Sequence, residues 1–84
     1  MSHFVYILKS ESSPKSYVGI TSNLERRLRE HNSGKNFYTK RYLPWIMIYI
    51  EKYDSLLSAR SREKYLKSAA GRKFLKGIFK KFGN

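Results

Sequence analysis

One carboxylate, Glu63, interrupts an apolar stripe that recurs at helical spacing in the C-terminal part of the chain. At about 100° per residue, the stripe consists of Leu56, Ala59, Glu63, Leu66 and Ala70. Burying an unpaired carboxylate is costly, so Glu63 must meet a cation, a metal ion or a proton. An ion pair with one of the many Lys or Arg side chains is the ordinary explanation, and a divalent metal site is the functional one.

Arg27 and His31 lie one turn apart on a predicted helix. Leu24 and Leu28 mark the buried side of that helix, so both polar side chains can face the rest of the fold. Taken alone, such an arginine usually reaches for water and such a histidine is usually a satisfied core residue. The other charged residues of the helix are expected to point elsewhere and carry no chemistry: Arg26, Arg29 and Glu30.

Two tyrosines, Tyr6 and Tyr17, fall on neighbouring predicted strands. Residues 3–9 (HFVYILK) are apolar on both faces, as expected for a strand that is covered on both sides. Strand character resumes at residues 17–21 (YVGIT), and the segment between the two runs is a turn. The two runs therefore predict an antiparallel hairpin with Tyr6 and Tyr17 side by side.

Capping signals and periodicity predict the remaining elements. Ser22 and Glu25 have the spacing of a capping box, which predicts a helix from about Asn23 to Asn32 that stops near Gly34. Residues 35–44 are interpreted as a loop, and residues 45–53 (WIMIYIEKY) as a third strand.

Two more helices are predicted after the third strand. Asp54 or Ser55 caps a helix that runs to about Ala69, and Gly71 breaks it before a last helix from Arg72 to Phe82. The order β-β-α-β-α-α predicts an α/β fold of the α+β kind, in which a small three-stranded antiparallel sheet is flanked by helices.

The charge of the chain points to a polyanionic partner. Lys and Arg number 18 against 6 Asp and Glu, which gives a formal net charge of +12 at pH 7. Nucleic acid is the leading partner class for such a chain. The basic segment 72–82 would also suit an anionic membrane surface, but its apolar side favours core packing, and no membrane partner is expected.

Length and composition indicate one folded domain, residues 1–84. Hydrophobic residues make up 40% of the chain, which is too rich for a disordered tail. The chain has no cysteine, which excludes a disulfide framework and a thiolate metal site. Because the N-terminus lacks the features of a signal peptide and the longest apolar run, Trp45 to Ile50, is too short for a membrane span, a cytoplasmic location is expected.

An ordered set of residues resembles the GIY-YIG nuclease signature. The set consists of Phe4-Val5-Tyr6 on one strand, Tyr17-Val18-Gly19 on the next, Arg27 and His31 on a helix, and Ala59 followed by Arg62-Glu63. The resemblance covers about residues 3–70, and its specificity lies in the order of the elements. It departs from the family pattern at Phe4, where the family has glycine, and a late asparagine found in some members has no counterpart except the terminal Asn84.

The resemblance implies a metal-dependent endonuclease that cuts phosphodiester bonds of nucleic acid, taken here to be DNA. Glu63 would hold one Mg²⁺ or Mn²⁺, and Arg27 would bind a phosphate oxygen. Tyr6 would orient or deprotonate the attacking water, which requires nearby cations to lower its pKa from about 10. Tyr17 would assist, with the two tyrosine roles exchangeable, and His31 would donate a hydrogen bond or orient a tyrosine.

Other residues have supporting roles on this interpretation. Gly19 would let the substrate or Tyr6 approach the backbone closely. Four loop residues are predicted phosphate contacts: Lys35, Thr39, Lys40 and Arg41. Without an evident targeting domain, weakly selective or structure-selective action, or a recruiting partner protein, is expected. The sequence does not decide whether the substrate is DNA or RNA, or what the oligomeric state is. Two alternative functions also stay open: a catalytically silent nucleic-acid-binding module and a basic ribosome- or nucleoid-associated protein.

Overall fold

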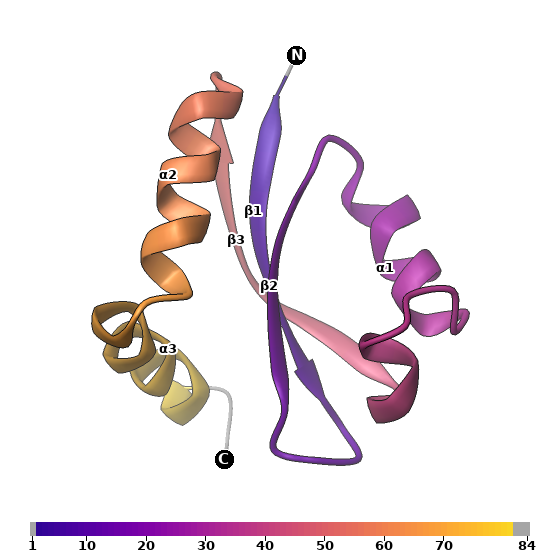
Figure 1. Cartoon of the computed structure of the whole chain (residues 1–84). Helices are drawn as coiled ribbons and strands as arrows, with labels where there is room; N and C mark the ends of the chain where they lie inside the picture. The colour runs from indigo at the N-terminus through magenta and orange to yellow at the C-terminus, as the bar shows by residue number, and fades with distance from the viewer. Residues whose placement is uncertain (1, 82–84) are drawn as a thin grey trace.

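A computed structural model describes residues 2–81 and gives the predicted order of elements (Figure 1). The elements are β1 (His3–Ser10), β2 (Ser16–Thr21), α1 (Leu24–Asn32), the 3-10 helix η1 (Thr39–Tyr42), β3 (Trp45–Tyr53), α2 (Leu56–Leu66) and α3 (Ala69–Lys81). The three strands form one antiparallel sheet in the order β2-β1-β3. The predicted fold class is therefore confirmed.

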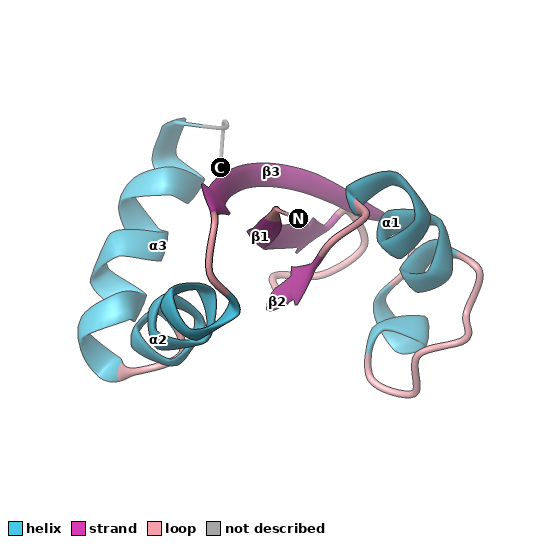
Figure 2. Ribbon diagram, turned by 90° about the horizontal axis from the view of Figure 1, so that it is seen from above, coloured by secondary structure: helices cyan, strands magenta, loops and turns pink. Residues whose placement is uncertain are grey.

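The central strand β1 carries both faces of the core. Val5 and Ile7 pack toward α2 and α3, whereas Tyr6 and Leu8 pack toward α1, and all four are fully buried. Figure 2 shows the sheet edge-on with α1 on one side and the α2–α3 pair on the other. The apolar pattern on both faces of residues 3–9 correctly predicted this double burial, because only a strand between two layers buries consecutive residues.

The hairpin register fixes what lies beside Tyr6. Tyr6 pairs with Gly19 across the β1–β2 ladder, and Leu8 pairs with Tyr17. On the other side of β1, the pairing with β3 shifts between Ile7 and Leu8, which is a β-bulge. Tyr6 thus faces α1 from the middle of the sheet, opposite a residue that has no side chain.

Helix α1 begins differently from the prediction. The N-cap is Asn23, whose side-chain oxygen accepts the backbone N–H of Arg26 at 3.0 Å. The predicted Ser22–Glu25 capping box is wrong, because Asn23 satisfies the free N–H one position later. The segment 35–44, interpreted as a loop, contains the 3-10 helix η1, which Asn36 begins by accepting the N–H groups of Tyr38 and Thr39.

The break between the last two helices also lies earlier than predicted. Helix α2 ends at Leu66 rather than near Ala69, and Gly71 lies inside the first turn of α3. Ser68 separates the helices, since its hydroxyl accepts the N–H of Gly71. Gly71 is a glycine for packing reasons, because an added Cβ would collide with the Tyr65 carbonyl and the Leu66 backbone. The predicted end at Phe82 lies outside the described residues.

A partly buried ion pair connects α2 to the sheet. Arg62 donates to both carboxylate oxygens of Glu51 on β3, at 2.9 and 3.0 Å. The same carboxylate accepts the hydroxyls of Tyr49 and Tyr53, and the Arg62 guanidinium lies over the Phe74 ring at 4.8 Å. A bidentate pair with additional hydrogen bonds holds one orientation, so it sets the position of α2, and with it Glu63, relative to β1.

The contact at Gly71 predicts a large difference between two glycines of α3. Gly71→Ala should destabilise the protein by about 1–3 kcal/mol, because the methyl group forces the α2–α3 junction apart. Gly77→Ala is the matched control: its Cβ meets nothing within 4 Å, so it should stabilise by about 0.5–1 kcal/mol. Urea unfolding measures both, and equal effects of the two substitutions would contradict the packing assignment.

Candidate active site

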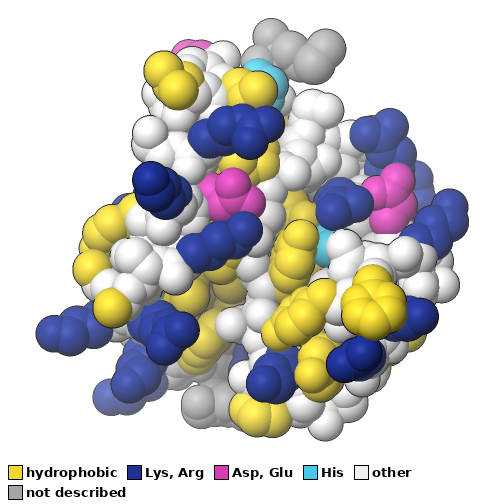
Figure 3. Space-filling view, in the orientation of Figure 1, with side chains coloured by type: hydrophobic (Ala, Val, Ile, Leu, Met, Phe, Trp, Pro, Cys, Tyr) yellow, Lys and Arg dark blue, Asp and Glu magenta, His cyan; other side chains and the backbone are white. Residues whose placement is uncertain are grey.

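A cavity of about 410 Å³ opens between the sheet, α1 and α2. Its walls come from four elements and one turn and comprise His3, Tyr6, Tyr17, Gly19, Ile20, Thr21, Ser22, Arg27, Leu56, Arg60 and Glu63. Four of the predicted catalytic and metal-binding residues therefore line one cavity, and the fifth, His31, lies directly behind Tyr6. Figure 3 shows acidic side chains set among Lys and Arg on this face of the molecule.

Tyr6 reaches its position because Gly19 leaves room for it. An added Cβ at Gly19 would lie 2.5 Å from the Tyr6 hydroxyl oxygen and 3.0 Å from Cε2 of Tyr17. The two tyrosine rings lie side by side, with centroids 6.3 Å apart. Of the two alternatives predicted for Gly19, close approach of the substrate or of Tyr6, the structure shows that of Tyr6.

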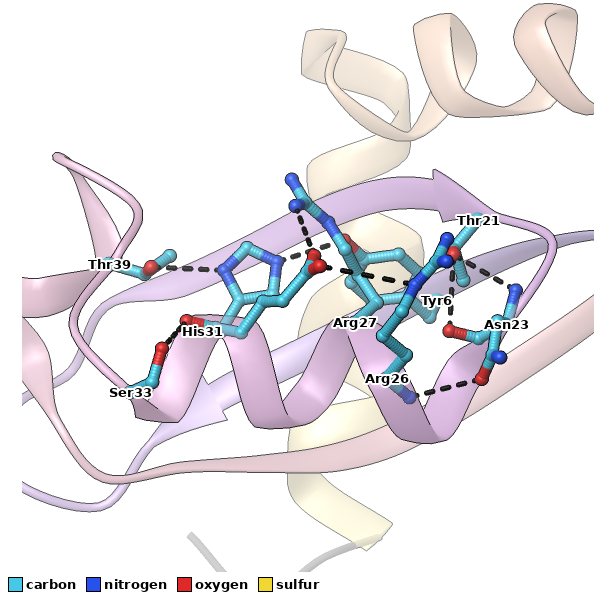
Figure 4. Close-up of polar contacts among 9 residues, drawn as sticks. Tyr6, Thr21, Asn23, Arg26, Arg27, His31, Ser33 and Thr39 are labelled. Atoms are coloured by element: carbon cyan, nitrogen blue, oxygen red, sulfur yellow. Dashed lines mark hydrogen bonds and ion pairs between the residues drawn. The ribbon is translucent and has the colours of Figure 1, made fainter.

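The Tyr6 hydroxyl is held by two residues of α1 (Figure 4). Arg27 Nε donates to it at 3.2 Å, and His31 Nε2 lies 2.9 Å away. An arginine N–H can only donate, so the hydroxyl accepts from Arg27 and gives its own hydrogen to His31 Nε2. His31 then carries its proton on Nδ1, which donates to Thr39 Oγ1 at 2.9 Å. This tautomer is assigned from the hydrogen-bond network.

Burial keeps both members of the Tyr6–His31 pair neutral. Tyr6 and His31 are fully buried. Burial raises the pKa of Tyr6 to about 12 against the opposing effect of the Arg27 hydrogen bond. Burial and the charge of Arg27 lower the pKa of His31 to about 4. The predicted fall of the Tyr6 pKa is therefore wrong, because the loss of solvent outweighs the nearby cation.

Arg27 has a second partner that the sequence did not reveal. Its Nη1 donates to Glu30 Oε1 at 3.0 Å, while Arg26 lies 3.9 Å from the other oxygen of that carboxylate. Glu30 was expected to point away from the site. The pair forms because residues three apart are neighbours on a helix surface. Glu30 occupies the outer edge of the guanidinium, so an incoming phosphate competes with it for Arg27.

Glu63 lines the cavity and is paired with Lys67. Lys67 Nζ lies 3.0 Å from Glu63 Oε2, and the Glu63 side chain is 23% exposed. The position of this carboxylate is therefore compatible with both the ion pair and the metal site that its sequence context suggested. The predicted stripe is partly correct: Ala59 and Leu66 are fully buried, but Leu56 is exposed and Ala70 belongs to α3.

The donor set around Glu63 suits a weakly held divalent cation. Among the described residues lining the cavity, Glu63 is the one carboxylate. Residues 2–81 contain no cluster of three His, Cys, Asp or Glu side chains that would enclose a metal. Mg²⁺ keeps several waters and commonly binds through one or two carboxylates and substrate phosphate, so a single partly exposed carboxylate fits it, with Oε1 outside the pair with Lys67.

The four predicted loop contacts separate in the structure. Thr39 is fully buried between His31 and the indole of Trp45, whose Nε1 donates to the Thr39 carbonyl at 2.7 Å. Thr39 therefore orients His31 and does not face a phosphate, contrary to the prediction. Lys40 and Arg41 are exposed and lie over the Phe37 ring at 5.1 and 4.9 Å. Lys35 lies with Arg26 and Arg29 around a separate shallow pocket.

Comparison with known proteins gives the family of this fold. A model of the GIY-YIG catalytic domain matches residues 2–76. The chain belongs to the GIY-YIG family. Its Tyr6, Tyr17 and Gly19 occupy the strands expected from the family signature, with α1 packed against them. Family membership supports a nuclease-type function with nucleic acid as substrate, and GIY-YIG nucleases generally use a divalent metal.

Several relatives are similar along most of their length. A UPF0213 protein of Staphylococcus haemolyticus is 38% identical over 77 residues, which cover 90% of this chain and 93% of the relative. One from Syntrophus aciditrophicus is 46% identical over 68 residues, or 77% of this chain and 76% of the relative. The NMR structure of a UPF0213 protein from Bacillus halodurans is 30% identical, has a TM-score of 0.56, and covers 93% of this chain and 85% of that one.

Besides Glu30, sequence reasoning missed three residues at this candidate site. His3 and Arg60 line the cavity, and Lys67 pairs with Glu63. The i, i+4 spacing of Glu63 and Lys67 was available as a signal, whereas His3 and Arg60 are brought in only by the packing of α2 against the sheet.

Within residues 2–81, no helix has the length and apolar character needed to cross a membrane.

The depressed pKa of His31 predicts a pH dependence of stability. The pKa is about 4 in the folded protein against 6.5 as the ordinary value, so the unfolded chain binds the proton more tightly. This contribution is complete above pH 6.5 and is lost as the pH falls toward 4. The loss should approach about 1.4 kcal/mol per pH unit, or roughly 3 kcal/mol in total.

Urea unfolding between pH 7 and pH 4 measures this loss. His31→Gln should lack the histidine part of the slope, which separates it from the titration of carboxylates. In a His3→Gln variant His31 is the single histidine, and its NMR titration should show the low pKa directly. A midpoint near 6.5 would contradict the buried, neutral state.

Proposed function

We propose that this chain is a metal-dependent endonuclease that hydrolyses phosphodiester bonds of DNA in the cavity between β1, β2, α1 and α2. One observation carries the proposal: a buried tyrosine–histidine pair, an arginine and a carboxylate meet at the same cavity. Hydrolysis needs a nucleophilic water, charge stabilisation at the phosphoryl oxygens and help for the departing 3′ oxygen. The cavity offers groups suited to each requirement.

Tyr6 and His31 form the base. As the attacking water bonds to phosphorus, its proton passes to the Tyr6 oxygen while the Tyr6 proton passes to His31 Nε2. The bond from phosphorus to the 3′ oxygen breaks, and His31 becomes an imidazolium that Thr39 steadies at Nδ1. Because the Tyr6 pKa is about 12, the hydroxyl relays the proton in a concerted step and does not wait as a tyrosinate. Tyr17 lies beside Tyr6 and orients the same water.

Arg27 couples substrate binding to this base. Its Nε–H occupies the lone pair of Tyr6 that must accept the proton of water, and its Nη1 is held by Glu30. A phosphate oxygen draws the guanidinium away from both partners, since a phosphate offers two acceptors to the planar fork. The move leaves the Tyr6 oxygen free at the moment when a scissile phosphate is present.

Glu63 would hold the divalent metal, Mg²⁺ or Mn²⁺. When bound, the ion supplies Lewis-acid stabilisation to the phosphoryl and leaving oxygens. Lys67 contacts only Oε2 of this carboxylate, so Oε1 would be the oxygen offered to the ion. The Lys67 ammonium lies beside this carboxylate, where it can meet a phosphate of the same strand.

Two conservative substitutions test this assignment. Tyr6→Phe removes the proton relay and Glu63→Gln removes the metal-binding charge, so each should lower single-turnover cleavage of labelled flapped DNA in Mg²⁺ or Mn²⁺ at least a hundredfold. Tyr65→Phe and Glu25→Gln change the same groups at exposed positions outside the cavity and should cut at the wild-type rate.

Unfolding measurements must accompany the assay, because Tyr6→Phe also leaves His31 Nε2 without its partner, at a cost of about 1–3 kcal/mol. Both variants should remain folded at the assay temperature. Binding without metal-dependent cutting by the wild type would refute the nuclease and favour the silent binding module. Undiminished cutting by Tyr6→Phe would refute the proposed base.

A further inference from the structure

A second hollow, of about 340 Å³, adjoins the candidate active site between β2 and the α2–α3 junction. Core residues form the floor of the hollow: Val18, Leu66 and Leu75 are each less than 9% exposed. Tyr17 lines both this hollow and the active-site cavity, so the two share a wall residue. We name it the tyrosine hollow, after Tyr17 and its neighbour Tyr38.

Aromatic rings form one wall of the tyrosine hollow. The Tyr17 ring lies against His31, with centroids 4.8 Å apart, and against Tyr38 at 6.2 Å with a tilt of 32°. The row thus starts at the buried His31 and passes through Tyr38, which is 42% exposed, to Tyr42, whose ring centroid lies 5.5 Å from that of Tyr38. Figure 3 shows hydrophobic side chains gathered beside the hollowed middle of this face.

Two cations complete the lining. Lys67 and Arg72 are exposed, and both line the tyrosine hollow. Lys67 also reaches Glu63 of the active site at 3.0 Å, so it stands at the boundary between the two spaces. The hollow has an apolar floor, an exposed aromatic ring and positive charge at one edge. These features match the parts of a nucleotide, which are a nucleobase that stacks on rings and a phosphate that pairs with cations.

We propose that the tyrosine hollow binds an unpaired nucleotide next to the scissile phosphate, with its base against Tyr38 and its phosphate at Lys67 and Arg72. This inference rests on the proposed nuclease function and deepens it. It names the substrate class as nucleic acid with at least one unpaired base beside the cut, such as a flap or a single strand.

A continuous duplex does not fit this hollow. Inside a duplex both faces of every base are covered by neighbouring bases, and exposing a face costs unstacking energy that is least for an already unpaired base. A duplex could still touch Lys67 and Arg72 through its phosphates, but it would gain nothing from Tyr38. Sensitivity to the Tyr38 ring therefore separates the two classes of substrate.

The test measures binding by fluorescence anisotropy, with EDTA present, of a labelled oligothymidine and of a labelled hairpin duplex. Tyr38→Ala should weaken oligothymidine binding about tenfold and change duplex binding less than twofold. Tyr38→Phe keeps the ring and should bind both probes as the wild type does. Tyr65→Ala removes an equally exposed tyrosine outside the hollow, at 43% exposure, and should also leave both affinities unchanged.

Tyr38→Leu, which keeps apolar volume without a ring, is measured alongside in case Tyr38→Ala fails to fold, and it should show the same selective loss. An equal loss on both probes, or no loss on oligothymidine in a folded variant, would overturn the proposal. Because no metal is present in the binding assay, its outcome is independent of whether the wild type cuts DNA.

Discussion

The burial of the Tyr6 hydroxyl at the centre of the sheet is the constraint on which the rest of the site depends. A buried hydroxyl needs partners, and here Arg27 and His31 supply them from one edge of α1. The glycine opposite Tyr6 makes the approach possible. Strand β1, strand β2 and helix α1 are thus held together around one polar atom, and His31 is fixed in turn by Thr39.

Much of this arrangement could be predicted from the sequence because it follows from local periodicity. The two-sided apolar pattern of residues 3–9 requires a central strand, and the one-turn spacing of Arg27 and His31 places both on the sheet side of α1. The rest depends on contacts between distant segments. The pKa of Tyr6 is set by how completely the fold excludes water. Thr39 is buried because η1 brings it against Trp45. Gly71 is required because the backbone of α2 lies against it.

The ions of the site share a second feature: each is already neutralised by a neighbour. Arg27 is paired with Glu30, and Glu63 with Lys67. In a chain with a net charge of +12, such pairs reduce local repulsion, and in the proposed mechanism phosphate and metal compete with them when a substrate arrives. Lys67 contacts Glu63 and also lines the tyrosine hollow, which links the site proposed for the scissile phosphate to the site proposed for the neighbouring nucleotide.

The central claim is that the phosphodiester bond is cut where Tyr6, Arg27 and Glu63 meet. The most direct measurement is a crystal structure of the Tyr6→Phe variant with a short DNA strand and Mn²⁺. The account predicts a phosphate in the active-site cavity, with Arg27 turned from Glu30 to its oxygens and the ion on Glu63. A strand bound elsewhere on the basic surface, with the Arg27–Glu30 and Lys67–Glu63 pairs intact, would contradict it.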